Sequence, residues 1–287
     1  MGAKMKQYWR IFLLVFLCLA TVVVWYGVAS LRPHGLRFVM LDIGQGDALY
    51  IESPTGVQII IDGGPGDALL GQVGAVMSVF DRSIDMIINT NPDRDHFEGF
   101  LPLLDRYTVG AFMETGSDAE SNPLWRELER KISEQGIPRT IARKGQRIDM
   151  GGGAYIDILF PDRDVKTFSH NDASIIARLT YGKTSVLLTG DTTQKMEKYI
   201  VGIDPASLKA DILKVAHHGS KTSTSEELVR ATDPAMAVIS AGRDNQFGHP
   251  NQETLDTLEK FDVPYLVTAT EGRIEFRSDG KQWVRVK

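Results

Sequence analysis

The feature that most limits how this chain can fold is an uncharged, apolar run that extends from Ile11 to Leu31. As an α-helix, a run of about 20 residues spans the roughly 30 Å of hydrocarbon in a bilayer. Lys4, Lys6 and Arg10 precede the run, and basic residues on one side of a span hold that side in the cytoplasm. We therefore predict a cytoplasmic N-terminus at residues 1–10 and a transmembrane signal anchor at residues 11–31.

The same segment also has features of a signal peptide that is removed after export. Gly27, Val28 and Ala29 are small or compact residues of the kind found near cleavage sites. The apolar run is longer than the central region of a usual signal peptide, about 7–15 residues, which favours an uncleaved anchor. Both interpretations place the rest of the chain outside the membrane, and the favoured one predicts a single-pass protein of the bacterial cytoplasmic membrane.

The sequence after the apolar run is acidic. The chain has 32 basic and 37 acidic residues, and four of the basic residues but none of the acidic ones precede residue 33. Residues 33–287 therefore carry 28 basic and 37 acidic groups, a net charge of −9. Surfaces that bind nucleic acid are normally basic, so this balance counts against such a surface. Cys18 is the only cysteine and has no partner for an internal disulfide.

Strands alternate with helices along this acidic part of the chain. Apolar runs bounded by glycine and polar residues predict strands, and apolar residues at helical spacing predict helices. The predicted strands are residues 37–43, 48–53, 57–62, 85–90, 140–143, 155–160, 174–181, 184–189, 212–216, 235–240, 265–268, 273–277 and 283–286, and the predicted helices are residues 68–80, 123–135, 225–231 and 252–261. This alternation, with hairpins in both halves, predicts one layered α/β domain over residues 33–287.

Four loops that follow apolar strands are rich in side chains that bind metal ions. They are residues 91–96 (Asn-Pro-Asp-Arg-Asp-His), 190–191 (Gly-Asp), 217–220 (His-His-Gly-Ser) and 248–250 (Gly-His-Pro). Because strand ends open onto the edge of a layered sheet, loops that are distant in sequence can converge there. Taken alone, the Asp-Arg-Asp and Gly-Asp segments are also explained as turns. The adjacent histidines are less easily explained in this way, because two of the six histidines of the chain lie there. The occurrence of all four, in order and after strands, is what predicts a site.

A cluster of carboxylates and imidazoles suits metal-assisted hydrolysis. A divalent ion lowers the pKa of a bound water toward neutrality and polarises the bond under attack. A mixed set of oxygen and nitrogen ligands is compatible with zinc and leans toward manganese, which prefers harder oxygen ligands. We expect one or two divalent ions, Mn2+ or Zn2+.

Longer stretches around these loops resemble the hydrolase domain of the ComEC-type competence proteins, which has the metallo-β-lactamase fold. The resemblance lies in residues 39–48 (VMLDIGQGDA), 61–64 (IDGG), 90–99 (TNPDRDHFEG), 171–174 (NDAS), 187–191 (LLTGD), 213–221 (LKVAHHGSK) and 245–250 (NQFGHP), and it covers roughly residues 37–270. It implies a four-layer αββα sandwich with the site at one edge of the sheets, here preceded by one transmembrane helix.

The resemblance also implies roles for single residues. The implied metal ligands are Asn91, Asp93, Asp95, His96, Asp191, His217 and His218, with Asp191 bridging two ions and one of the two adjacent histidines at the metal. The implied catalytic residues are Asp95, His218 and His249, of which His249 completes the site or donates to the leaving group. Asp47 and Asp62 are implied to orient ligands or loop backbone, and Ser220, Lys221 and Asn245 to bind substrate.

Two departures from the family pattern affect these expectations. Asn91 stands where the family loop begins with histidine, which removes one good nitrogen ligand. An asparagine oxygen can ligate a hard cation, but it is neutral and binds softer ions less well than imidazole does. The multi-span channel region of full ComEC proteins has no counterpart in this sequence. We therefore expect a stand-alone hydrolase domain behind one anchor, and not a DNA channel.

The preferred interpretation is an exported, membrane-anchored, metal-dependent phosphodiesterase or nuclease related to DNA uptake. Single-stranded DNA is its expected substrate, and competence or DNA-uptake channel proteins are its expected partners. A hydrolase of a small phosphodiester or lactone is the second interpretation, which the acidic charge balance favours. A binding module with a decayed metal site is the third, which Asn91 would explain. β-Lactam hydrolysis is not expected, because the first loop lacks the paired histidines of zinc lactamases.

Overall fold

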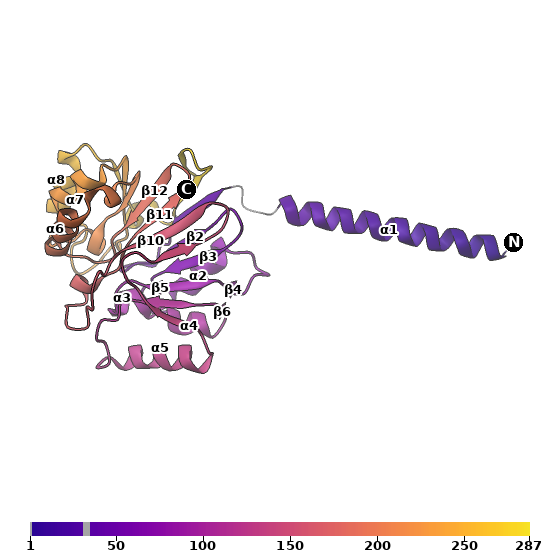
Figure 1. Cartoon of the computed structure of the whole chain (residues 1–287), viewed down its shortest axis with the longest axis horizontal. Helices are drawn as coiled ribbons and strands as arrows, with labels where there is room; N and C mark the ends of the chain where they lie inside the picture. The colour runs from indigo at the N-terminus through magenta and orange to yellow at the C-terminus, as the bar shows by residue number, and fades with distance from the viewer. Residues whose placement is uncertain (1, 31–34) are drawn as a thin grey trace.

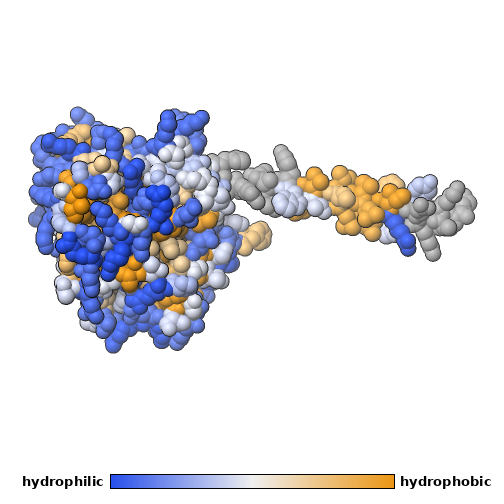
Figure 2. Space-filling view, in the orientation of Figure 1, coloured by the Kyte–Doolittle hydropathy of each residue, from blue (hydrophilic) through white to orange (hydrophobic). Residues whose placement is uncertain are grey.

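A computed structural model describes residues 2–30 and 35–287 of the chain (Figure 1). The first range forms one helix, α1 (Gly2–Ser30), which stands apart from the rest of the molecule. Its segment Tyr8–Trp25 is long and apolar enough to cross a membrane and is not buried by the protein, and Figure 2 shows it as an apolar belt. Residues 31–34, which contain the end of the predicted span and the predicted domain boundary, lie outside the described residues.

Two large sheets form the centre of the globular part. The first sheet has the strand order β17-β16-β1-β2-β3-β5-β7-β8 and the second the order β15-β14-β13-β12-β11-β10-β9. The strands of the first sheet are β1 (Leu36–Met40), β2 (Leu49–Glu52), β3 (Gln58–Ile61), β5 (Met86–Asn89), β7 (Phe112–Glu114), β8 (Arg139–Ile141), β16 (Ile274–Ser278) and β17 (Trp283–Arg285). Those of the second are β9 (Arg147–Asp149), β10 (Ala154–Phe160), β11 (Ile176–Tyr181), β12 (Thr184–Leu188), β13 (Ile212–Lys214), β14 (Met236–Ile239) and β15 (Tyr265–Val267). β4 (Ser83–Ile84) and β6 (Thr108–Val109) pair as a small separate ribbon.

Helices cover the outer face of each sheet. On the first sheet lie α2 (Ala68–Val76), α3 (Arg94–Phe97), α4 (Phe100–Leu104) and α5 (Pro123–Glu134). On the second lie α6 (Gln194–Ile203), α7 (Glu226–Thr232) and α8 (Gln252–Lys260). The short helices η1 (Asn171–Ala173), η2 (Pro205–Leu208), η3 (Ala216–Gly219) and α9 (Thr268–Glu271) occur in connections.

Three hydrophobic cores separate these four layers. Successive side chains of a strand point to opposite faces, so Ile87 of β5 packs under the first helical layer while Ile88 packs between the two sheets. In the second sheet, Leu188 faces the first sheet and Leu187 faces the helices. The predicted four-layer αββα architecture is therefore confirmed.

Most predicted elements are present within a few residues, and one helix was predicted too long. The helix expected over residues 68–80 ends at Val76. Arg37 Nη1 donates to the carbonyl oxygen of Val76 (3.3 Å), and Gln58 Nε2 donates to Asp81 Oδ2 (2.9 Å). These two contacts attach the residues before and after segment 77–80 to the end of the first sheet. The segment therefore leaves the helical conformation.

Several elements were not predicted at all, because most are too short to show an apolar period, and α4, although apolar, has only five residues with a proline among them. These are α3, α4, α6, β7, β9 and the small ribbon of β4 and β6. In α6, for example, the buried face contains Glu197 beside Met196 and Ile200, which weakens the helical apolar pattern.

The direction of the strands brings the four predicted loops to one edge. β3 and β5 run parallel in the first sheet, and β12, β13 and β14 run parallel in the second. A backbone hydrogen bond from Ile175 N to Thr90 O (3.0 Å) joins the two sheets at that edge. β1 points toward the same edge, because β1 and β3 are both antiparallel to β2. The chain therefore enters the domain from α1 at the opposite edge.

Candidate metal centre

His96 lies on α3 and is held from behind by Asp62, the residue after β3. Its Nδ1 is 2.9 Å from Asp62 Oδ2, and both side chains are buried. Asp62 is itself fixed, because Thr90 donates its N–H (2.7 Å) and its hydroxyl (2.6 Å) to the carboxylate. Donation from Nδ1 to a carboxylate leaves Nε2 as the ligand nitrogen, which is the usual support for a metal-binding histidine. The expectation that Asp62 orients a ligand agrees with this geometry.

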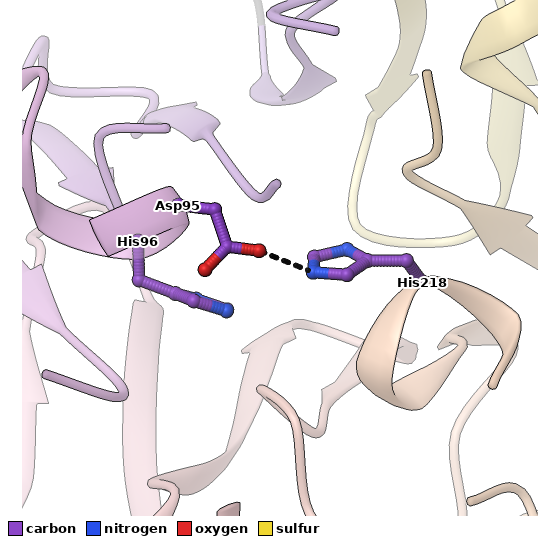
Figure 3. Close-up of side chains that lie close together, drawn as sticks. All are labelled: Asp95, His96 and His218. Atoms are coloured by element: carbon purple, nitrogen blue, oxygen red, sulfur yellow. Dashed lines mark ion pairs between the residues drawn. The ribbon is translucent and has the colours of Figure 1, made fainter. Parts of the chain in front are cut away.

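His218 has the same arrangement with a different supporting group. Its Nδ1 lies 3.1 Å from the carbonyl oxygen of Ser240, the residue after β14. Its Nε2 is 3.3 Å from Asp95 Oδ2 and 3.5 Å from Asp191 Oδ2. Figure 3 shows Asp95 and His96 on one side and His218 on the other, pointing toward one another. Of the two adjacent histidines, His218 is the buried one that faces the carboxylates.

These residues form a cage that suits one cation. Ligand atoms of Asp95, His96 and His218 lie within 4.8 Å of one another, and so do those of Asp47, Asp191 and His218. Among the described residues, the Nε2 atoms of His96 and His218 and Oδ1 of Asp191 are buried and make no well-directed hydrogen bond, although His96 Nε2 lies 3.0 Å from Asp191 Oδ2. Buried polar atoms without partners are costly. A divalent ion would satisfy all three, and the mixed imidazole and carboxylate set fits zinc or manganese.

The charges in the cage point to the same conclusion. Burial alone would lower the pKa of His218, but the carboxylates of Asp191 and Asp47 raise it to about 10. Burial alone would raise the pKa of Asp191, but His96 and His218 hold it well below its usual range. Each imidazole thus keeps a proton that balances the carboxylates. An ion bound between them would supply that positive charge instead.

Lys214, at the end of β13, lies beneath the cage and was assigned no role from the sequence. Its side chain is 1% exposed, its Nζ forms an ion pair with Asp47, and it donates to the carbonyl oxygen of Gly190 (3.0 Å). Burial alone would raise the pKa of Asp47, but Lys214 and His218 lower it. A lysine inside the apolar strand Ile-Leu-Lys-Val-Ala is a sequence signal that marks such a buried cation.

His217 and His218 are placed by an unusual backbone. Both have left-handed dihedral angles, with φ of 50° and 55°. This conformation is uncommon for residues other than glycine, and it is found where function requires it. His217 Nε2 lies 3.8 Å from Asp191 Oδ2, farther than His218 Nε2, and its side chain is 25% exposed. His217 therefore lies at the rim of the cage.

His249 comes from the fourth loop and lies beside His217. A Cβ atom added to Gly219 would lie 2.6 Å from Pro250 Cβ, so glycine permits the close approach of the third and fourth loops. The rings of His217 and His249 have centroids 5.7 Å apart. Partial burial and then the charges of His218 and His217 lower the pKa of His249 to about 4, which keeps it neutral near pH 7.

Asn91 and Asp93 lie next to the cage but are engaged elsewhere. Asn91 is fully buried, its Oδ1 accepts from the N–H of Asp93 (2.8 Å), and its Nδ2 donates to Asn171 Oδ1 (2.9 Å). Asp93 Oδ1 is 2.7 Å from Nδ1 of His170. In this structure the amide of Asn91 and one carboxylate oxygen of Asp93 are thus engaged in contacts with other side chains and backbone. His170 was assigned no role from the sequence.

The three residues expected to bind substrate differ in how they are placed. Lys221 is exposed, and its backbone N–H donates to Asn251 Oδ1 (2.9 Å). Ser220 is buried, and its hydroxyl lies 3.0 Å from that of Thr222. Asn245 closes its own loop, because its Nδ2 donates to the carbonyl oxygens of Gly242 (2.8 Å) and His249 (2.6 Å). The geometry of Asn245 therefore indicates that it shapes the loop carrying His249.

Comparisons with known proteins give the same fold and a specific set of relatives. A family model described as the metallo-beta-lactamase superfamily matches residues 41–243. The chain is 28% identical to ComE operon protein 3 of Bacillus subtilis over 257 residues (83% of this chain, 32% of that protein). It is 25% identical to competence protein ComA of Neisseria gonorrhoeae over 260 residues (87% of this chain, 34% of that protein). The chain thus spans about a third of the length of these relatives.

Solved structures show the fold alone. The diiron β-hydroxylase CmlA of Streptomyces venezuelae superposes with a TM-score of 0.53 at 15% identity, over 84% of this chain and 54% of that one. Zn2+-bound PqqB of Methylobacterium extorquens superposes with a TM-score of 0.51 at 12% identity, over 80% of this chain and 97% of that one. Together with the competence relatives, these matches confirm the resemblance that the motifs predict.

Proposed function

Because the chain belongs to the metallo-beta-lactamase superfamily, we propose that it is a metal-dependent phosphodiesterase held at the cytoplasmic membrane by α1, with residues 33–287 outside. The observation that carries the proposal is the cage of Asp95, His96, Asp191 and His218. In it His96 Nε2 lies 3.0 Å from Asp191 Oδ2, and His218 Nε2 lies 3.3 Å from Asp95 Oδ2. Burying several ionisable groups together is costly for a fold, and such clusters are typical of functional sites.

We assign the residues of the cage different roles in hydrolysis. When bound, a divalent ion activates a water and polarises the scissile bond. Asp62 and the Ser240 carbonyl fix the two imidazoles, so that the ligand atoms need no rearrangement. Asp95 is the cage carboxylate with the most exposed side chain (33%), and this places it where a substrate enters. We assign it the role of orienting the attacking water.

His249 is suited to assist the leaving group. Its Nδ1 lies 3.5 Å from Nε2 of Gln45, an amide donor, so its Nε2 holds the proton. The Nε2–H of a neutral imidazole can donate a hydrogen bond to a departing oxygen and so stabilise the negative charge that develops on it. The low pKa of His249, about 4, keeps it in this neutral form across the neutral pH range.

The cage supports one tightly held ion. Asp47, Asp62, Asp95 and Asp191 contribute four negative charges, which Lys214 and one divalent ion nearly balance. A further metal position beside Asn91 and Asp93 lacks this support, because the amide of Asn91 is used in hydrogen bonds to Asp93 and Asn171. We propose that a second ion binds there only when manganese is abundant.

Single-stranded DNA is the substrate we propose, on the basis of relatives that are named for competence. Competence or DNA-uptake channel proteins would then be partners. A small phosphodiester is the second candidate, favoured by the net charge of −9 on residues 33–287. The two candidate substrates differ in length and charge, but the bond that is cleaved is a phosphodiester in both.

The test is elemental analysis of the purified protein, followed by digestion assays with added Mn2+. We expect about one ion per chain and cleavage of single-stranded DNA that Asp191→Ala abolishes. Asp256→Ala, the same change at an exposed helical position, is the matched control and should keep full activity. Cleavage of bis(p-nitrophenyl) phosphate without cleavage of DNA would favour the small substrate. Absence of both bound metal and hydrolysis would contradict the proposal.

A further inference from the structure

Two apolar side chains project from the loop between α2 and β4. Val79 is 69% exposed and Phe80 is 93% exposed. Figure 2 shows an apolar projection on the side of the domain that faces α1, where Figure 1 draws this loop. Large apolar side chains gain free energy when they leave water. A phenylalanine that is almost wholly exposed at a loop tip therefore indicates an apolar partner.

The loop is fixed close to the point where the chain enters the domain. Arg37, the second residue of β1, donates to the carbonyl oxygen of Val76 (3.3 Å), and Asp81 accepts from Gln58 Nε2 (2.9 Å). Val79 and Phe80 lie between these two attachments. They are thus held at the end of the sheet where β1 and β3 begin.

The length of chain between α1 and β1 keeps this end near any membrane that α1 enters. Five residue steps separate Ser30 from Gly35, and an extended chain spans at most about 3.6 Å per step, or roughly 18 Å in all. The same end of the domain carries two exposed lysines in turns that contact each other. Lys183 N donates to the carbonyl oxygen of Gly280 (2.7 Å), next to Lys281. Lysines near a bilayer favour anionic headgroups.

We propose that Val79 and Phe80 insert into the headgroup region of the membrane that holds α1. This inference rests on the proposed membrane anchoring and goes beyond it, because it fixes the orientation of the domain. α1 supplies one attachment and the loop supplies a second, so the domain cannot rotate freely about its linker. The edge with Asp95 and His249 then faces away from the bilayer, since β1 runs from the membrane end toward that edge.

The experiment uses the full chain in phospholipid vesicles, with labels at single cysteines. Cys18 is replaced by alanine, which removes the natural cysteine. A polarity-sensitive fluorophore is then attached at Phe80→Cys and, as a matched control, at Phe247→Cys. Phe247 is also an exposed phenylalanine (55%), but it lies in the loop before His249 at the opposite edge. Val79→Cys provides a second reporter on the loop.

We expect the labels at positions 79 and 80 to shift their emission to shorter wavelength and to lose intensity when nitroxide-bearing lipid is added. The label at position 247 should show neither change. Flotation of the vesicles reports the anchoring separately. Protein that floats with the vesicles while the labels at 79 and 80 behave as in water would overturn this inference and leave the proposed function intact. Protein that does not float would overturn the anchoring, and this inference with it.

Discussion

Lys214→Met tests how the fold tolerates so many buried carboxylates. Lys214 and Asp47 are each 1% exposed and form an ion pair, and Lys214 also donates to the carbonyl oxygen of Gly190. Methionine keeps a stem of similar length but removes the charge and the donor. The carboxylate of Asp47 then stays buried, with His218 Nδ1 3.4 Å away as its nearest remaining cationic neighbour. Breaking a buried pair by removing one partner costs about 3–5 kcal/mol.

This loss is large enough to measure by unfolding. For a domain of this size each kcal/mol shifts the melting temperature by about 2–4 °C, so Lys214→Met should lower it by roughly 6–20 °C. Guanidinium unfolding of the metal-free protein, followed by tryptophan fluorescence, gives the free energy directly. The exposed Lys221→Met is the control and should change stability by less than about 0.5 kcal/mol.

A second variant separates loss of the pair from loss of volume or packing. Asp47→Leu combined with Lys214→Met removes both charges and should recover most of the stability, because no uncompensated carboxylate remains. The effect of Lys214→Met should also shrink in acid. The pKa of Asp47 is lowered in the fold, so its contribution is present at neutral pH and is lost as the pH falls. A change below about 1 kcal/mol, or no recovery in the double variant, would refute the assignment of Lys214 as the counter-ion.

The remaining predictions concern the metal, the site and the membrane. Asp191→Ala should abolish hydrolysis and leave the circular dichroism spectrum unchanged, and near-normal turnover by this variant would mean that the cage is not the active site. Asn91→His should tighten the binding of a second ion, which titration calorimetry measures. Two tightly held ions in the natural protein would contradict this prediction. The metal-free protein should lose stability as the pH rises above about 6.5 toward the raised pKa of His218, about 10, and a bound ion should flatten this dependence in melting curves. A reporter fused after Lys287 should be active outside the cytoplasm, and activity confined to the cytoplasm would contradict the predicted topology.

Residues on motif loops after strands could be placed from the sequence. His96, Asp191 and His218 follow apolar runs whose ends must open onto an edge, and the structure brings all three within the cage. The sequence also predicts that Asn91 weakens one metal position, and this stays a prediction. It did not indicate that Asp93 lies against His170, because His170 comes from a loop far along the chain.

Contacts between distant segments account for what the sequence did not predict. α2 ends early because Arg37, from another strand, donates to the carbonyl of Val76. Lys214 lies in an apolar strand, and its role depends on an aspartate that is distant in sequence. None of these partners can be read from local pattern.

The left-handed backbone at His217 and His218 lowers the stability of the fold at positions whose side chains we assign to the proposed site. A residue with a side chain in this conformation costs on the order of 1 kcal/mol, and glycine relieves that cost. At position 218 the buried imidazole that balances Asp47 and Asp191 outweighs this cost, but His217 is partly exposed, so a laboratory selection for heat resistance alone would favour glycine at position 217. Such a selection would enrich well-folded proteins without the His217 imidazole, so directed evolution of this domain needs a screen for turnover at every round.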